Sequence, residues 1–253
     1  FAVQRFGTGG VARVFGPVTA LWFIVLGACG LWRIIEYPAV LWALNPSYGA
    51  VFLFTHPGLA LIVLGAVFLA VTGVEGLYVD LGHFGRKPIV IAWFSLVFPA
   101  LLLNYFGQGA FVLSHDLAQI TNPFFEMFPE WSQVAIVIFA TAATIIASQA
   151  VITGTYSLAR QAIALNLLPR MTVRHTSETQ SGQIYMPQIN SILMVLVIIL
   201  VIAFGSSASL SNAYGIAVSG VMLVTTILLG VVMYRVWKWH LVPTLVVMIP
   251  FLV

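Results

Sequence analysis

Apolar stretches of about twenty residues follow one another along nearly the whole chain, and they decide what it can fold into. An α-helix needs about 20 such residues to cross the hydrocarbon of a bilayer. We expect six spans and the start of a seventh, at residues 17–35, 58–81, 88–106, 134–159, 187–204, 210–234 and from 241 onward. Charged residues make up 7% of the chain and apolar ones 61%, far from the balance of a soluble domain. The sequence therefore predicts an all-α polytopic membrane protein.

Basic residues alternate between the two sides of these spans. Nine of the ten lie in every second loop: Arg5, Arg13, Arg86, Lys87, Arg160, Arg170, Arg174, Arg235 and Lys238. The opposite loops hold Arg33 and the acids Glu36, Asp116, Glu126 and Glu130. By the positive-inside rule the nine mark the cytoplasmic side. This asymmetry accounts for the net charge of +3, so no nucleic-acid partner is expected.

Glu75 stands inside the second apolar run. A carboxylate at that depth costs about 2.5–3.5 kcal/mol on insertion scales, so it predicts a functional site. Gly73 and Gly76 flank it and would let a helix loosen and present backbone carbonyls to an ion. On a continuous helix Thr72, Glu75 and Tyr78 would share one face. The alternative is a glutamate that packs against a neighbouring helix or lies at the cytoplasmic interface.

Further polar groups lie near this run and in the fourth span. Asp80 is closer to the interface and serves either ion entry or pairing with Arg86. Thr141, Thr144 and Ser148 have the spacing of one helix face. Hydroxyls at this depth either join helices and bond carbonyls of their own helix, or line an ion pathway. For the second role Thr144 and Ser148 are the candidates.

No enzyme site is evident in the sequence. The five histidines lie in loops or near span ends, and none has a second ligand at metal-binding spacing. There is no Walker loop and no nucleophile elbow. Cys29 is the only cysteine, which excludes a disulfide framework and a cysteine-rich metal site within this sequence. We expect a protein that is not an enzyme and needs no cofactor.

Several distinctive motifs occur in order across nearly the whole chain: TGVEGLYVDLGHFGRKPI at 72–89, NYFGQGA at 104–110, NPFF at 122–125, ASQAVITGTYSLARQA at 147–162, HTSETQSGQIYMP at 175–187 and AYGIAVSG at 213–220. Together these motifs resemble the bacterial KUP family of potassium uptake permeases. The resemblance implies the fold of the amino acid, polyamine and organocation superfamily, in which two inverted five-helix repeats form the core and helices one and six are broken. Residues 1–253 would be part of one transmembrane transport domain, covering helices five to ten and the start of eleven of a longer protein. Glu75 would fall in broken helix six.

The same resemblance implies potassium uptake across the bacterial inner membrane, by proton-coupled symport and alternating access. Potassium would be held by Glu75, Thr72, Tyr78 and freed carbonyls near Gly73, together with helices one and three, which this chain lacks. Glu75 would alternately carry the coupling proton. The expected partners are potassium, protons and the lipid bilayer, and a homodimer is left open.

Two other functions are weighed against uptake by symport. A gated potassium channel would need contiguous filter carbonyls, and no TVGYG-like sequence is present. An amino-acid carrier of the same fold would need a free helix N-terminus facing a carboxylate, and an anionic Glu75 beside it opposes such a substrate. Both alternatives remain to be tested.

The charge pattern generates a prediction about topology. In a Cys29→Ser background, a cysteine at Ser181 should react with an impermeant thiol reagent only from the cytoplasmic side, and one at Glu126 only from outside. The measurement is labelling of intact cells against inverted vesicles. The opposite pattern would reverse the orientation.

Overall fold

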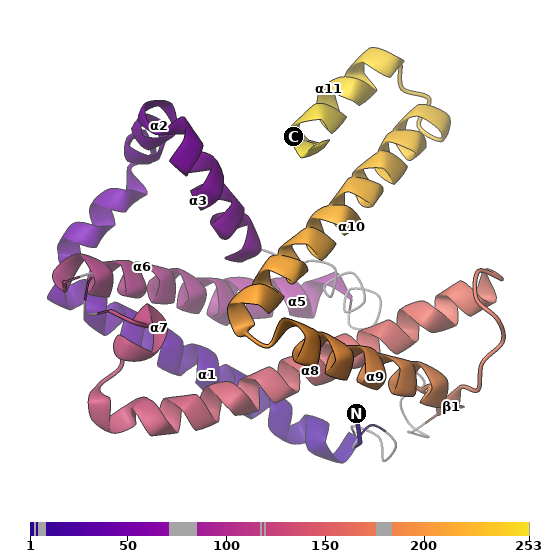
Figure 1. Ribbon diagram of the computed structural model, residues 1–253, viewed down its shortest axis with the longest axis horizontal. Helices are drawn as coiled ribbons and strands as arrows, with labels where there is room; N and C mark the ends of the chain where they lie inside the picture. The colour runs from indigo at the N-terminus through magenta and orange to yellow at the C-terminus, as the bar shows by residue number, and fades with distance from the viewer. Residues whose placement is uncertain are drawn as a thin grey trace. The chain divides into compact units, whose positions relative to one another are not determined.

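The computed structural model describes residues 1–2, 4, 9–70, 85–116, 118, 120–175 and 184–252. The described chain is helical apart from one short antiparallel hairpin. Its helices are labelled in Figure 1, and the chain divides into two compact units. The first comprises the described residues of 1–63 and 73–191, and the second those of 64–72 and 192–253.

Two long helices form the frame of the first unit. The first is α1 (Gly9–Glu36). The second is a continuous span, Arg86–Ser114, built from α5 (Arg86–Ala92), the π-helical turn η3 (Trp93–Val97) and α6 (Phe98–Ser114). Pro99 follows the π turn. Proline has no N–H to donate and its ring collides with the carbonyl four residues earlier, so a wider turn relieves both problems.

The two helices approach each other most closely at two glycines. A Cβ atom added to Gly30 would lie 2.2 Å from the carbonyl oxygen of Leu103, and one added to Gly107 would lie 2.5 Å from the Cα of Gly30. Backbone therefore meets backbone where α1 crosses α6. Ala100 and Ala110, both buried, extend this surface of small residues along α6.

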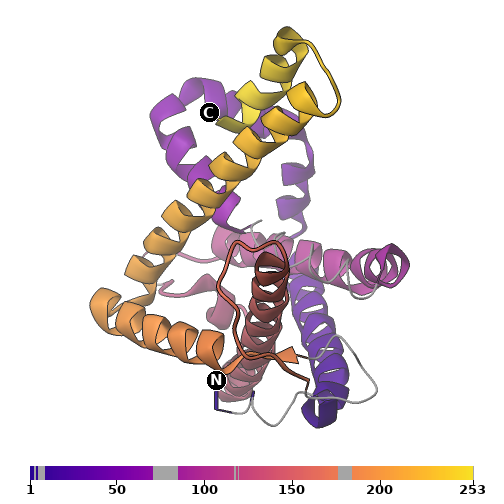
Figure 2. The same ribbon diagram turned by 90° about the vertical axis from the view of Figure 1, so that its right-hand side faces the viewer.

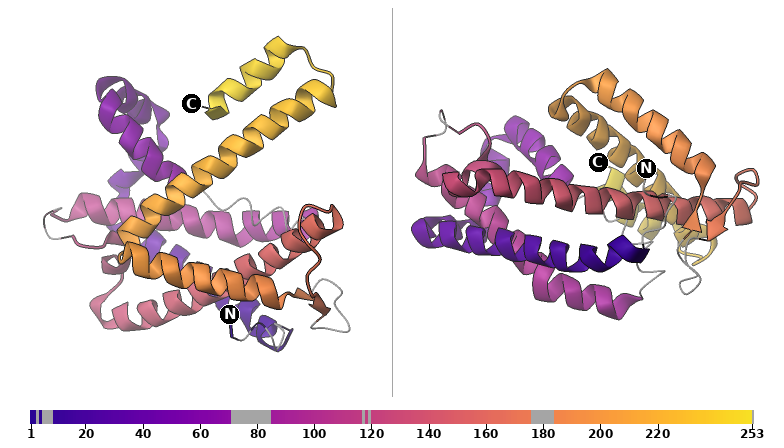
Figure 3. Two further views of the ribbon diagram at one scale, coloured as in Figure 1. Left: turned by 45° about the vertical axis from the view of Figure 1, so that its right-hand side comes forward. Right: turned by 90° about the horizontal axis from the view of Figure 1, so that it is seen from below.

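Helix α8 (Gln133–Ala164) crosses α1 and packs against it (Figures 1 and 3). At the crossing, the rings of Trp22 and Phe139 meet edge to face with their centroids 5.3 Å apart. Between α6 and α8 the chain forms the short helices α7 (Pro123–Glu126) and η5 (Glu130–Ser132). Between α1 and α3 (Pro57–Ala70) it forms η2 (Pro38–Leu44) and α2 (Pro46–Thr55).

The two Asn-Pro pairs begin helices. The side chain of Asn45 accepts a hydrogen bond from the backbone N–H of Ser47 at the start of α2, and that of Asn122 accepts one from Phe124 at the start of α7. Asparagine at the N-cap and proline at the first helical position suit a helix start, because each deals with a backbone N–H that lacks a partner there.

A small hairpin follows α8. Its strands β1 (Arg174–His175) and β2 (Ile184–Tyr185) pair antiparallel, with Arg174 opposite Tyr185. Ile184 and Met186 are buried against Ile152 and Tyr156 of α8, in a cluster that Phe1 also joins. The sequence did not predict this hairpin, since strands of two residues are too short to show an alternating pattern.

The second unit contains most of α9 (Pro187–Phe204), together with α10 (Ser207–Arg235) and α11 (Leu241–Leu252). Gly205 has φ +62° and turns the chain between α9 and α10, and Ser206 caps α10. The short connection predicts two antiparallel neighbours, but α9 and α10 diverge from the turn (Figures 1 and 2). A short loop fixes only the distance between two helix ends, not the angle of the helices. Within this unit α10 packs against α11, where Gly230 lies against the side chain of Met248.

The described helices confirm a multi-pass membrane architecture. Among them five are long and apolar enough to cross a membrane: Val14–Glu36, Arg86–Ser114, Glu130–Ala164, Pro187–Phe204 and Ser207–Arg235. They correspond to five of the six full spans expected. Of the second expected span, 58–81, the structure describes α3 (Pro57–Ala70), and α11 begins at Leu241 as expected.

Three described helices extend five residues or more beyond the expected spans: α1 begins at Gly9 rather than at 17, α8 ends at Ala164 rather than at 159, and α6 also ends later than expected. The third span was expected to end at Phe106, because Asn104 and Gln108 resemble an interfacial polar end. The helix instead continues to Ser114. Asn104 is buried, and its side-chain oxygen accepts a hydrogen bond from Gln108 one turn later at 2.7 Å. The Asn104 amide also donates to the Met127 sulfur at 3.8 Å, so this buried side chain has partners within the protein and does not mark an interface with water.

The close contact between Gly30 and Gly107 predicts that a methyl group added at Gly30 destabilises the protein. Gly30→Ala in the full-length protein should lower stability by about 1–3 kcal/mol or more, because the new atom meets backbone and only separation of the helices can relieve the clash. The measurement is the midpoint of thermal unfolding in detergent. Gly16→Ala is the matched control, since it adds the same atom to α1 with nothing within 4 Å. Equal midpoints for the two variants would contradict the assigned contact.

Candidate functional site

The residues expected to bind potassium lie outside the described part of the chain. These are Thr72, Gly73, Glu75 and Tyr78, and Asp80 lies outside it as well. The described chain reaches Ala70 in α3 and resumes at Gly85, just before α5. Their role in ion binding stays a prediction from the sequence.

The serine and threonine hydroxyls of α8 are described, and each donates to a backbone carbonyl of its own helix. Thr141 donates to Val137 at 2.7 Å, Thr144 to Ala140 at 2.8 Å and Ser148 to Ile145 at 2.9 Å. Thr144 and Ser148 are exposed on this chain. A hydroxyl whose hydrogen is held by a carbonyl keeps oxygen lone pairs that can accept or coordinate. The geometry is therefore compatible with both roles expected for these residues.

Arg33 has a denser set of partners than the sequence indicates. Its Nε donates to the backbone carbonyl of Met127 at 2.6 Å, and its Nη1 pairs with Glu36 at 2.7 Å. The guanidinium also lies over the rings of Trp32 and Phe111, 4.7 and 5.1 Å from their centroids. The side chain is 14% exposed. Sequence reasoning treated Arg33 only as the exception to the charge pattern, and that exception was the signal that could have found it.

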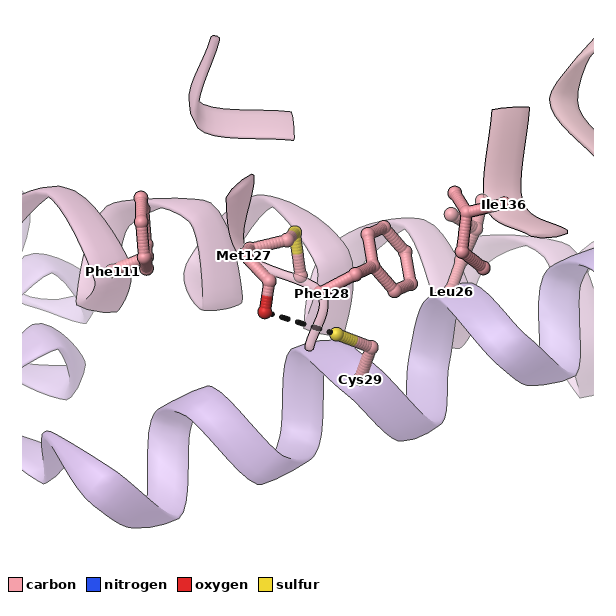
Figure 4. Packing of buried hydrophobic residues seen from close by; sticks show 6 residues of the cluster. All are labelled: Leu26, Cys29, Phe111, Met127, Phe128 and Ile136. Carbon is pink, nitrogen blue, oxygen red and sulfur yellow. Dashed lines mark hydrogen bonds between the residues drawn. The ribbon is translucent and has the colours of Figure 1, made fainter. Parts of the chain in front are cut away.

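The segment that Arg33 holds is inserted between three helices. Met127 is fully buried and Phe128 is 4% exposed, and both follow the short helix α7. They form a cluster with Leu26 and Cys29 of α1, Phe111 of α6 and Ile136 of α8 (Figure 4). The Cys29 thiol lies 3.6 Å from the Met127 carbonyl oxygen (Figure 4). Because Arg33 also donates to this oxygen, it faces two donors from α1.

A hollow of about 430 Å³ opens beside this segment. Its lining includes Arg33, His115, Glu126, Phe128, Glu130 and Gln133. The Glu126 carboxylate accepts hydrogen bonds from the backbone N–H groups of Thr121 and Asn122, at 3.0 and 2.8 Å. His115 packs on Phe111 with ring centroids 4.3 Å apart. These residues lie in the loops that the charge pattern assigns to the outside.

Buried polar contacts also join the other end of α8 to neighbouring segments. The Tyr156 hydroxyl donates to the side-chain oxygen of Asn190 at 2.7 Å, which ties α8 to the start of α9. The side chain of Gln4 donates to that of Gln149. The charge pattern assigns the C-terminal end of α8 to the cytoplasmic side. In the described part of the chain, no three His, Cys, Asp or Glu side chains come close enough to share a metal ion.

Comparison with known proteins agrees with the membrane architecture. The whole chain, residues 1–253, matches the family model described as the K+ potassium transporter integral membrane domain. The chain is 63% identical to "Probable potassium transport system protein Kup 2" of Mesorhizobium japonicum over 95% of its length, and 62% identical to "Probable potassium transport system protein Kup 3" of Rhizobium johnstonii over 99%. It is 58% identical to "Probable potassium transport system protein Kup" of Brucella anthropi over its whole length.

The chain spans about two fifths of the length of these relatives, 38% or 39% in each case. No solved structure matches it significantly. Proteins of the matched family are transporters rather than enzymes and have no known cofactor. A match of this length and identity means that the chain belongs to the KUP family of potassium transporters.

Proposed function

We propose that the protein containing this chain takes up potassium across the bacterial inner membrane. The observation that carries the proposal is the match of the entire chain to the membrane domain of potassium transporters, with relatives near 60% identity that are named as potassium transport proteins. The apolar helices Arg86–Ser114 and Glu130–Ala164 supply the membrane scaffold that such a function needs.

The ion is proposed to be held by Thr72, Glu75 and Tyr78, with carbonyls near Gly73. Potassium favours several oxygen ligands that replace its water, and these residues supply a hydroxyl, a carboxylate, a phenol and backbone oxygens. Thr144 and Ser148 are proposed to lie along the ion pathway, where their hydroxyl oxygens keep lone pairs free for a passing cation.

Transport is proposed to be proton-coupled and to proceed by alternating access in an inverted-repeat fold. A carboxylate at membrane depth, as proposed for Glu75, can either bind a proton or attract a cation, and this competition would couple the two ions at one group. Rocking of one repeat against the other would expose the site to each side in turn.

The role of Glu75 is tested by removing its charge. Glu75→Gln keeps the size and most hydrogen bonds, so a packing role predicts near-normal uptake. Loss of a charged ligand instead predicts a fall in potassium uptake of roughly 10- to 100-fold, since an interaction with a charged group is worth about 1.5–3 kcal/mol. The measurement is rubidium or potassium uptake at matched membrane abundance of the full-length protein.

Glu178→Gln is the control for this substitution, because it makes the same change in a connector expected to lie in water. Glu75→Asp should retain partial uptake if the shorter carboxylate still reaches the ion. If Glu75→Gln takes up potassium at the parental rate at every external pH, Glu75 is neither an ion ligand nor a proton carrier.

Cation competition separates uptake from the alternative functions. Oxygen ligands that fit potassium should also accept rubidium, which is only slightly larger, whereas sodium and amino acids should compete poorly. The measurement is inhibition of potassium uptake by each competitor. Inhibition by amino acids but not by rubidium would favour an amino-acid carrier, and currents without saturation or proton dependence would favour a channel.

A further inference from the structure

We propose that Arg33 is a positioning residue for transport: it holds Met127 and Phe128 in place as the outer closure of the ion pathway. This inference rests on the proposed function and on the predicted orientation. It concerns a part of the chain remote in sequence from the expected potassium ligands. Three features of the described residues support it.

The first feature is the depth at which the segment is inserted. Met127 and Phe128 come from a connector rather than from a spanning helix, yet Met127 has no exposed surface. The two side chains occupy the space between Leu26 and Cys29 on one helix and Ile136 on another. If they withdrew, the walls of this space would join the hollow beside them.

The second feature is how the segment is held. The Met127 carbonyl accepts a charge-assisted hydrogen bond from Arg33 at 2.6 Å, and among the described residues the other donor facing it is the weak thiol donor of Cys29 at 3.6 Å. Both of these donors belong to α1, whereas α6 contributes a weak hydrogen bond of 3.8 Å from the Asn104 amide to the Met127 sulfur. Arg33 therefore makes the one charge-assisted bond to the segment, and the apolar contacts around it tolerate sliding better than that directed bond does.

The third feature is the charge around the hollow. Glu126 and Glu130 line it and favour the entry of cations, while Arg33 stands in the wall next to Phe128. Glu36 neutralises Arg33 at 2.7 Å, so the guanidinium stays in place without repelling the cations that the two carboxylates attract. A closure held by this residue borders the hollow whose two carboxylates would attract a cation entering from outside.

Cys29 makes the closure measurable, because it is the only cysteine of this chain and is buried under Met127. The experiment uses the full-length protein with any cysteines outside this chain replaced, in intact cells. The probe is an impermeant, positively charged methanethiosulfonate applied from outside. The parent should react slowly, and Arg33→Gln should react roughly tenfold faster, since the segment opens more often once its directed bond is lost. Arg33→Lys should fall between them, because a lysine offers no planar fork to hold both the Met127 carbonyl and Glu36.

Two further variants keep the test independent of folding defects. Phe128→Ala leaves Arg33 intact and removes part of the closure, so it should also speed labelling. Arg170→Gln makes the same change as Arg33→Gln at an exposed arginine with no role in the closure, and its labelling rate should equal that of the parent. Total reactive thiol after denaturation reports the amount of protein in each case.

Rubidium uptake then distinguishes positioning from ion binding. Arg33→Gln should lower the maximal rate roughly fivefold or more while the KM for rubidium stays within about twofold, because the ligands are untouched and only closure is impaired. The proposal is overturned if Arg33→Gln labels at the parental rate, if Cys29 reacts only from the cytoplasmic side, or if the loss of uptake lies entirely in KM. A parent that takes up no rubidium would refute the proposed function, whereas the ratio of labelling rates would still decide the role of Arg33.

Discussion

The contact of backbone with backbone at Gly30 and Gly107 is the constraint on which the rest of the first unit depends. In a bilayer, two helices gain nothing by hiding apolar surface from lipid, so their association relies on close van der Waals packing. Small residues allow that packing, and here the Cα of Gly30 lies where a Cβ of Gly107 would have to be. The crossing fixes the relation of α1 to α6. The residues that hold the connector, Arg33 on α1 and Phe111 on α6, lie beyond it on the same two helices.

The crossing of α1 and α6 also positions the two connectors that pack on both helices, η2 and the segment after α7. Ile34 and Ala110 bury Val40 of η2, while Cys29 and Phe111 receive Met127 and Phe128. Each connector therefore packs on the pair of helices rather than on one alone. One side chain makes several of the polar contacts in this region. Arg33 donates to a backbone carbonyl, pairs with a carboxylate and lies over two aromatic rings. A single arginine in a region of low dielectric can do this because its planar group offers donors at its edge and a face for stacking.

The fold was predictable from the sequence to the extent that it depends on apolar length. The spans ending at Phe204 and starting at Leu241 were expected at those residues, because a helix in lipid must satisfy its own backbone and the apolar run sets its length. The family was predictable because specific motifs such as NYFGQGA and HTSETQSGQIYMP occur in order. The end of α6 and the divergence of α9 and α10 were not predictable, since both follow from which side chains meet in three dimensions.

The contacts of Arg33 were not predictable either. Its isolation in the charge pattern is visible in the sequence, but its partner, a carbonyl 94 residues away, is not. The expected ion ligands around Glu75 lie outside the described residues, so their arrangement still rests on the one-face spacing of Thr72, Glu75 and Tyr78.

The π turn at Trp93–Val97 divides the span Arg86–Ser114 into two halves whose side chains face different directions. A wide turn accommodates one residue more than an α-helix would, and one residue corresponds to about 100° of rotation about the axis. The residues of α6 face α1 through Gly107, Leu103 and Ala100, but the side chains of α5 are set about 100° away from the faces that an uninterrupted helix would give them. Loss of one residue between Trp93 and Val97 in a related chain would leave the α1–α6 contact intact and turn Arg86 and Lys87 to another side of the helix. The turn therefore uncouples the direction in which the basic end of the span faces from the packing of its other end.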